Sequence, residues 1–291
     1  MKLYPILSTN INVQKPTFKQ KTFPADIWYK KLIQQGLKDE FGISCKIEDL
    51  QSIAGPEELM FIIKNLKPAH YKLGENFRAQ FHLHTNASDG HMSAKEFLEQ
   101  CADWANRMFK SLTEKDDLPP FSASITDHDS ADNVKLAIAQ ISQNPDKYKN
   151  FKFVTGCEFL FDGYEAPHSA FEAIGLGFNP FDKDLQPLIA GQRIAQNKVS
   201  DIPKVKAAGG ILSFAHPMLF IEKLEDENFF SFLKANGVDG IEKYYQYVTK
   251  AQSFIDERMP KLLEQLKKFK FFYTGGTDAA GKTIFYRDRI Y

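Results

Sequence analysis

FHLHTNASDG, residues 81–90, carries two histidines two positions apart and an aspartate five residues after the second. Side chains alternate between the two faces of an extended strand, so His82 and His84 are expected to point to the same side. Two imidazoles so placed can hold one metal ion, and Asp89 follows in a loop beside a neighbouring ion. A His-x-His pair alone is equally typical of a surface or hydrogen-bonded pair, so the rest of the chain has to distinguish the two interpretations.

The composition is that of an ordinary globular protein of 291 residues, with 43% hydrophobic and 25% charged residues. Lys+Arg and Asp+Glu both number 37, so no net charge attracts nucleic acid, which is a disfavoured partner. The three cysteines are widely spaced, so we expect neither a disulfide framework nor a zinc ribbon. No apolar run reaches membrane-spanning length and the N-terminus lacks a signal-peptide core, so we expect a cytoplasmic protein without a membrane partner.

From residue 79 onward one plan repeats, in which an apolar run leads into a polar cluster and then into a helical segment. Seven strands are expected, at Ala79–His84, Phe121–Thr126, Phe151–Phe159, Phe171–Phe178, Gly210–Phe214, Val238–Tyr244 and Phe269–Thr274. Helices are expected between them at Ser93–Arg107, Ala131–Ser142, Leu185–Ala208, Leu219–Asn236 and Thr249–Lys268. Such units predict an α/β fold with a parallel sheet covered by helices. Polar clusters after the strands favour a TIM-like (β/α) barrel, with an open doubly wound sheet as the alternative.

The N-terminal part, residues 1–77, does not follow this plan. One amphipathic helix is expected over Pro24–Phe41, ending at Gly42, and a second over Pro56–Leu66. The apolar stripe of the first helix is expected to contain Ile27, Trp28, Leu32, Ile33 and Leu37. We therefore predict a helical N-terminal extension or cap over 1–77 and a barrel domain over 78–291, with packing on the barrel favoured over a partner-binding arm.

Four of the seven histidines follow predicted strands, and acidic residues accompany them. The motifs are ITDHD at 125–129, GCE at 156–158, FAHP at 214–217 and GGTD at 275–278, in addition to residues 81–90. Each histidine alone is as typical of a cap or a turn as of a metal ligand. A barrel would collect all of them at one mouth, so their joint placement favours metal binding.

These motifs resemble those of the polymerase and histidinol phosphatase (PHP) family, which read like HLHTNASDG, ITDHD, a strand-end Glu, FAHP and GTD with a downstream His. The resemblance covers about residue 81 to the C-terminus. It implies a distorted (β/α)7 barrel that holds two or three divalent ions (zinc, manganese, iron or magnesium), in agreement with the seven predicted strands. Carried over by position, His82, His84, Glu158 and Asp278 would hold one ion, Glu158 and His216 a second, and Asp89 and His128 a third.

Two positions depart from the family pattern. Similar family sequences place histidine where this chain has Glu172 and Ala280. A glutamate can ligate through oxygen and favours manganese, magnesium or iron, so Glu172 is kept as a metal ligand. Alanine cannot ligate, so the third ion would depend on water or substrate oxygens.

The resemblance implies a metal-dependent phosphoesterase that hydrolyses a small phosphorylated metabolite by metal-activated hydroxide. Nucleotides, sugar phosphates and histidinol phosphate are the substrate classes considered. Asp127 and Asp129 are the catalytic candidates, because either could protonate the leaving oxygen or orient a ligand histidine. The candidate anion contacts are Arg193, Lys243 and Lys282.

Three other functions remain open. The main alternative is a degenerate PHP-like protein that binds metal or ligand with little catalysis, for which Glu172 and Ala280 are the evidence. A PHP nuclease or polymerase-associated module is disfavoured by the balanced charge. An amidohydrolase of related barrel design would use the same metal chemistry on a C–N bond.

Overall fold

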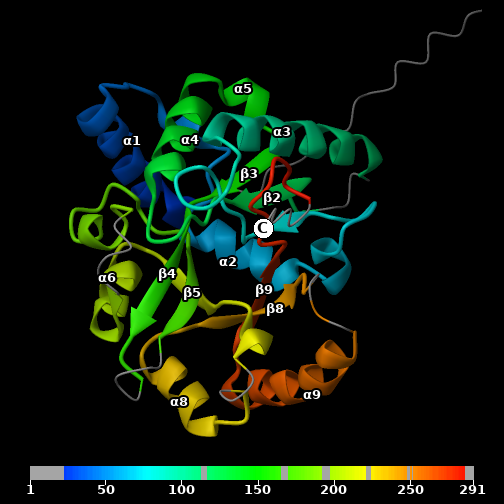
Figure 1. Ribbon diagram of the computed structural model, residues 1–291. Helices are drawn as coiled ribbons and strands as arrows, with labels where there is room; N and C mark the ends of the chain where they lie inside the picture. The colour runs from blue at the N-terminus through cyan, green and yellow to red at the C-terminus, as the bar shows by residue number, and fades with distance from the viewer. Residues whose placement is uncertain are drawn as a thin grey trace, which may run out of the picture.

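Two β-sheets form the centre of the computed structural model, which describes residues 23–112, 117–164, 170–191, 197–220, 224–247, 250 and 252–285 (Figure 1). The smaller sheet is parallel, in the order β1 (Ala79–Gln80), β2 (Phe121–Ser124), β3 (Phe151–Val154). The larger sheet has the order β6-β4-β5-β7-β8-β9. Its strands are β4 (Gly156–Asp162), β5 (Phe171–Leu176), β6 (Asn197–Lys198), β7 (Ile211–Phe214), β8 (Gly240–Tyr245) and β9 (Phe272–Gly276). Each of the seven predicted strands overlaps an observed strand.

Strand β5 runs antiparallel to both of its neighbours, β4 and β7, whereas the other pairs in the larger sheet are parallel. The expectation of an all-parallel sheet is therefore wrong at β5. Only residues 163–170 separate β4 from β5, and a parallel crossover needs about a dozen or more residues. A connection this short favours an antiparallel return.

The two sheets meet through isolated parallel bridges, Leu83 with Ala279 and His128 with Glu158. The strand pairing of the described residues gives two sheets instead of one continuous cylinder, so the (β/α)7 barrel is not confirmed, although the mixed α/β class is. Both bridges fall where the predicted metal ligands lie. The backbone itself therefore ties the ends of β1, β2, β4 and β9 together around one place.

One predicted strand, Phe151–Phe159, is divided at Thr155 into β3 and β4, which belong to different sheets. Gly156 lies at this division, where an added Cβ would come within 2.1 Å of the Ser124 side-chain oxygen and 2.7 Å of the Ile125 carbonyl oxygen. Only glycine permits the chain to pass this close to the end of β2. The close approach allows one continuous segment to leave the small sheet and enter the large one.

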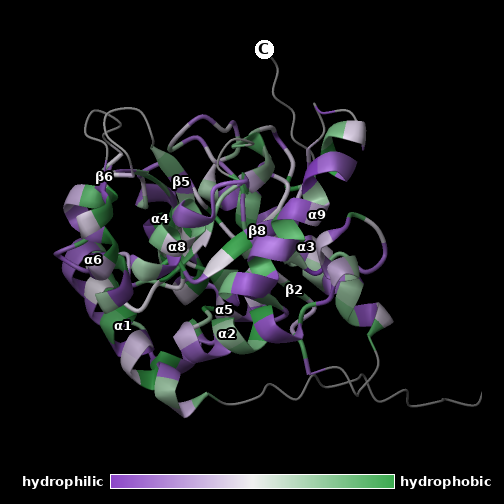
Figure 2. Cartoon of the chain, turned by 90° about the horizontal axis from the view of Figure 1, so that it is seen from below, coloured by the Kyte–Doolittle hydropathy of each residue, from purple (hydrophilic) through white to green (hydrophobic). Residues whose placement is uncertain are grey.

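Helices cover the sheets on the outside. They are α1 (Ile27–Phe41), α2 (Pro56–Asn65), α3 (Ala94–Ser111), α4 (Asp132–Gln143), α5 (Pro145–Tyr148), α6 (Ile202–Ala207), α8 (Glu227–Ala235) and α9 (Gln252–Phe269). Helix α3 packs on β2 and β3, and α8 packs on α9 at the lower end of the view in Figure 1. The helices are banded polar and apolar in Figure 2, as expected for elements with one face on the core. None of the described helices is long and apolar enough to cross a lipid bilayer.

The predicted helix positions agree with the structure except at two places. The capping box at Ser93 is present, with Ser93 Oγ accepting the Glu96 backbone N–H. The described residues of Leu185–Ala208 are α-helical only over Ile202–Ala207, because Pro187 and the left-handed Gly191 interrupt the predicted helix. Leu219–Asn236 is α-helical over Glu227–Ala235. Short 3₁₀ turns supply the remaining local structure, at Pro24–Asp26, Ile47–Leu50, Pro68–Tyr71, Gln186–Leu188, Val199–Asp201 and Pro217–Leu219.

Helix α1 ends at Gly42 as predicted, in the left-handed conformation, but its buried face differs from the predicted stripe. Tyr29, Ile33, Gly36 and Leu37 face the core. Ile27, Trp28 and Leu32 are each more than 40% exposed. The Tyr29 hydroxyl donates to the Phe178 carbonyl oxygen at 3.0 Å, which turns this face of the helix inward.

The N-terminal segment is also held by the carboxylate of Asp26, which accepts the backbone N–H groups of Glu57 and Glu58 at 2.8 and 2.9 Å. Asp26 thus satisfies two donors at the start of α2 from 31 and 32 residues away. Because Asp26 is buried, water cannot readily take over its two hydrogen bonds.

We expect Asp26→Ala to lower the free energy of unfolding by about 1–3 kcal/mol, because it leaves two N–H groups at a helix start without their acceptor. Urea unfolding followed by circular dichroism measures the change. Asp39→Ala is the matched control, because Asp39 is an exposed residue of α1 that accepts only from Gln35. Equal stability of the two variants would show that the Asp26 contact does not hold the segment in place.

Candidate metal centre

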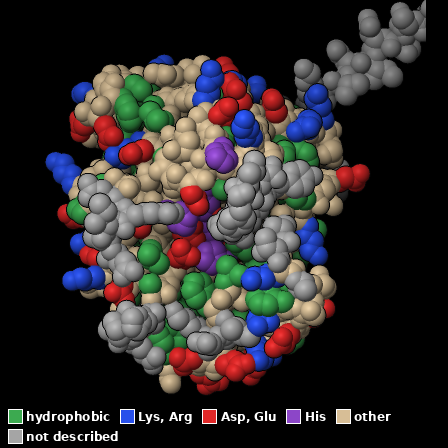
Figure 3. Space-filling view, in the orientation of Figure 1, with side chains coloured by type: hydrophobic (Ala, Val, Ile, Leu, Met, Phe, Trp, Pro, Cys, Tyr) green, Lys and Arg blue, Asp and Glu red, His purple; other side chains and the backbone are tan. Residues whose placement is uncertain are grey.

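Seven of the eight predicted metal ligands come together at the strand ends where the two sheets meet. His82 and His84 follow β1, His128 follows β2, His216 follows β7 and Asp278 follows β9. The two glutamates lie within strands, Glu158 on β4 and Glu172 on β5. Histidine and acidic side chains gather near the middle of the molecular face seen in Figure 3. The donor atoms form three overlapping sets, which we number first His82–His84–Asp278, second Glu158–Glu172–His216 and third His84–His128–Glu158.

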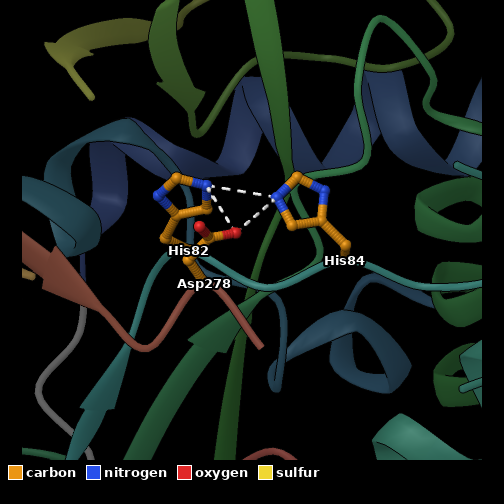
Figure 4. Close-up of side chains that lie close together, drawn as sticks. All are labelled: His82, His84 and Asp278. Atoms are coloured by element: carbon orange, nitrogen blue, oxygen red, sulfur yellow. Dashed lines mark hydrogen bonds and ion pairs between the residues drawn. The ribbon is translucent and has the colours of Figure 1, made fainter. Parts of the chain in front are cut away.

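The first set is shown in Figure 4, where both imidazoles and the carboxylate point toward one another. Nε2 of His82 lies 3.2 Å from Nε2 of His84, and these atoms lie 3.6 and 3.0 Å from Asp278 Oδ1. Glu158 Oε2 is 3.2 Å from both nitrogens. Tetrahedral coordination with bonds of about 2.0–2.1 Å separates ligand atoms by roughly 3.3 Å. The spacing of these donor atoms therefore fits one small divalent cation.

The second set uses the other oxygen of the same glutamate. His216 Nε2 lies 3.1 Å from Glu158 Oε1 and 3.0 Å from Glu172 Oε2. Glu158 thus has one oxygen toward each set, which is the arrangement of a carboxylate that bridges two ions. Glu172 stands at the sequence position where the PHP pattern has histidine. Its carboxylate oxygen lies where that pattern leads us to expect a metal ligand.

The third set is less complete. His128 Nδ1 lies 3.2 Å from Glu158 Oε2, and His128 Nε2 lies 3.8 Å from Asp89 Oδ1. Asp89 is partly exposed and belongs to none of the three sets formed by the described residues. Ala280 is buried and supplies only its carbonyl oxygen, to the backbone N–H of His91.

The charges of the centre favour a cation at its middle. Burial opposes a charged ring, but the carboxylates of Glu158 and Asp278 outweigh it and raise the pKa of His84 to about 9. Glu158 and Glu172 likewise raise the pKa of His216 to about 10 against the effect of burial. Burial raises the pKa of Glu158 and Asp278, but the neighbouring histidines outweigh it and hold both well below the usual range.

Two buried imidazole nitrogens that face each other at 3.2 Å cannot both present lone pairs unless a proton or a metal ion lies between them. Buried carboxylates beside them require positive charge for the same reason. Nitrogen and oxygen donors without sulfur suit an ion with catalytic coordination. The residues present therefore fit a divalent metal.

Backbone strain is concentrated at the same place. The non-glycine residues with positive φ in the described chain are Asp129, His216, Asp278 and Lys270, of which the first three lie at or beside the centre. Such conformations cost roughly 1–3 kcal/mol each and persist only where surrounding contacts hold them. Here the contacts aim His216 and Asp278 at the donor sets.

The two catalytic candidates lie beside the donor sets and are hydrogen-bonded to the surrounding loops. Asp127 accepts the Thr85 backbone N–H at 2.6 Å, the Thr85 hydroxyl and the Ser88 hydroxyl at 2.7 Å. Burial raises the pKa of its carboxyl, against the effect of these donors. Asp129 accepts from Asn197 Nδ2 at 2.7 Å and from the Leu160 N–H at 3.3 Å. These contacts are those expected of residues that hold the ligand-bearing loops in place.

The three candidate anion contacts have different surroundings. Lys243 lies over the rings of Tyr244 and Tyr273 and lines a surface pocket with residues of α2, away from the donor sets. Lys282 is exposed in the loop after Asp278, and its carbonyl oxygen accepts from Gln100. Arg193 lies outside the described residues.

Two buried residues of β8 contact the centre and were not predicted from the sequence. Glu242 contacts His82 through both carboxylate oxygens, and Tyr245 donates to Asp278 at 2.5 Å. The available signal was an acidic residue inside the strand predicted at Val238–Tyr244, which contains both Asp239 and Glu242, because an acidic side chain is rarely buried without a partner.

No protein-family model matches the chain, and no curated protein matches it. Among solved structures, a protein from Bifidobacterium adolescentis provisionally described as a metal-dependent phosphoesterase shares 14% identity at a TM-score of 0.49, over 71% of this chain and 89% of that one. An amidohydrolase from Chromobacterium violaceum with bound sulfate and no metal shares 15% identity at 0.48, over 70% and 88%. PsfC from Pseudomonas syringae shares 15% at 0.42, over 70% and 76%.

We expect Glu158→Gln to weaken the binding of manganese or zinc by at least about 100-fold, beyond the 10–100-fold typical of outer-shell changes. The amide cannot place an anionic oxygen toward both donor sets. Elemental analysis and calorimetric titration of the metal-free protein measure the loss.

Glu58→Gln is the control. Glu58 is a buried glutamate of α2, and its carboxylate lies 2.8 Å from the Lys152 ammonium group. Undiminished metal binding by the Glu158 variant would exclude the assignment of this centre.

Proposed function

We propose that the chain is a metal-dependent phosphoesterase of the PHP type that acts on a small phosphorylated metabolite in a barrel-like mouth. The observation that carries the proposal is the position of Glu158, whose two oxygens face two separate donor sets. Paired metal sites with a bridging carboxylate are typical of hydrolases that act on phosphate esters. The motif resemblance favours the phosphoester over the C–N bond of an amidohydrolase.

Two ions are the proposed cofactor, and zinc, manganese, iron and magnesium are the metals considered. When bound, such ions polarise a phosphoryl oxygen and lower the pKa of coordinated water to about 7. His82, His84, Glu158 and Asp278 would hold the first ion, and Glu158, Glu172 and His216 the second. The partial exposure of Asp89 supports a weaker third position.

The remaining residues of the site would position the ligands and the substrate. Asp127 would hold the 85–88 turn that precedes Asp89, and Asp129 would hold the end of β2 against β4. Both contacts support a positioning role over proton donation to the leaving oxygen. Lys282 follows Asp278 in the same loop, a position that suits contact with a phosphate group. The contacts of Lys243 do not support such a role.

The test is release of inorganic phosphate from a panel of nucleotides, sugar phosphates and histidinol phosphate, with added manganese or zinc and with chelator. We expect release that chelator abolishes and that Glu158→Gln reduces at least about 100-fold, because the metals supply the chemistry. The Glu158 variant, purified in parallel, excludes a contaminating phosphatase as the source.

A degenerate binding protein is the second candidate, because Ala280 offers no ligand and Asp89 joins no donor set. Two bound metal equivalents without turnover of any ester would favour this candidate. The absence of bound metal, without turnover of any ester, would contradict the phosphoesterase and leave this candidate as a ligand-binding protein.

A further inference from the structure

We propose that strand β8 supplies no metal ligand but orients the ligands of both sites. Glu242 acts on both sites, and the hydroxyl of Tyr245 acts on the first. This inference rests on the proposed function, because it concerns the same metal centre. Glu242 is 1% exposed and Tyr245 is 7% exposed, so water does not take over their contacts.

Glu242 determines which nitrogen of His82 faces the metal. Its carboxylate oxygens both lie 3.1 Å from His82 Nδ1, on the opposite side of the ring from the nitrogen that faces His84 and Glu158. An ionised carboxylate only accepts, so Nδ1 has to carry the proton. Nε2 then presents its lone pair to the cation, as in the carboxylate–histidine–metal arrangement.

The same carboxylate also reaches the second site. Oε2 of Glu242 accepts the backbone N–H of His216 at 2.8 Å. His216 has a φ of 27°, a sparsely populated value for a residue with a side chain, so this bond helps to hold a strained backbone. The ring of His216 is thereby aimed at Glu158 and Glu172.

The hydroxyl of Tyr245 acts on the first site, while its ring packs edge-on against His216 and is kept in Tyr245→Phe. The hydroxyl donates to Asp278 Oδ2, while Oδ1 of the same carboxylate faces His84. Residues 242 and 245 of a regular strand would point to opposite faces. The pairing of β8 with β9 jumps from Glu242–Thr274 to Tyr244–Gly275, which leaves Lys243 as an extra residue. This bulge turns both side chains toward the metal centre and leaves Lys243 on the outer surface.

Glutamine at position 242 performs the two tasks less well. If its amide oxygen takes the place of Oε2 and keeps the His216 N–H, its NH₂ group takes the place of Oε1, 3.1 Å from His82 Nδ1, where a second donor opposes a proton on that nitrogen. If the oxygen stays with His216, the NH₂ group favours the His82 tautomer protonated at Nε2. That tautomer blocks the ligating nitrogen, while the volume of the side chain is unchanged.

The experiment titrates metal-free protein with Co²⁺ against a chromophoric chelator and records the visible Co²⁺ spectrum. We expect Glu242→Gln to weaken both cobalt sites about 10–100-fold, the range of outer-shell changes, and to alter the spectrum. Tyr245→Phe is expected to weaken the first site by roughly tenfold or less and to leave the second unchanged. Thermal unfolding of each metal-free variant reports on the fold separately.

Glu58→Gln is again the control, as a buried glutamate away from the centre. Equal weakening by the Glu58 and Glu242 variants would mean a purely structural role and would overturn the inference. Unchanged cobalt affinity and an unchanged spectrum in Glu242→Gln would also overturn the inference, but would leave the proposed function intact. A wild-type protein that binds no cobalt, zinc or manganese would instead overturn the proposed function, and this inference with it.

Discussion

Both oxygens of Glu158 face imidazole nitrogens, at 3.1–3.2 Å from four different histidines, with 1% of the side chain exposed. A buried carboxylate so placed is stable only if positive charge lies among its neighbours, either as protons on the rings or as metal ions. The raised pKa values of His84 and His216 and the lowered pKa of Glu158 express the same requirement. Much of the surrounding structure serves to bring these groups to one place and to hold them there.

The backbone accomplishes most of this convergence. Isolated bridges join the residues after β1 to those after β9, and His128 to Glu158 itself. Gly156 allows the chain to cross from one sheet to the other beside the end of β2. Helix α1 packs in the main core, fastened by Tyr29. Helix α2 packs in a second apolar cluster with residues of β1, β3 and β5, and the Asp26 carboxylate holds its start. Strain at His216 and Asp278 is tolerated because these contacts surround it.

Exposure differs across the centre in a way that fits a reaction site. His82 and His84 are fully buried, whereas the side chains of Glu172 and Asp89 are 27% and 39% exposed. Ligands on the inner side are thus held by the protein and those on the outer side face solvent. A substrate would approach from the side of Glu172 and Asp89, where coordination positions can remain open.

The local patterns of the chain determined the apolar strands, the Ser93 cap, the Gly42 helix end and the candidate metal ligands, because these depend on spacing within a few positions. The antiparallel course of β5 follows from the short connection between β4 and β5, a local feature that the repeating plan concealed. Tertiary structure alone decided the division at Gly156, the inward face of α1 and the contacts of Glu242 and Tyr245. Each of these three depends on a partner far away in the sequence or on a strand bulge, and neither leaves a periodic signal. The position of an acidic residue in an apolar strand is visible from the sequence, but the histidine that it orients, 160 residues away, is known only once the chain has folded.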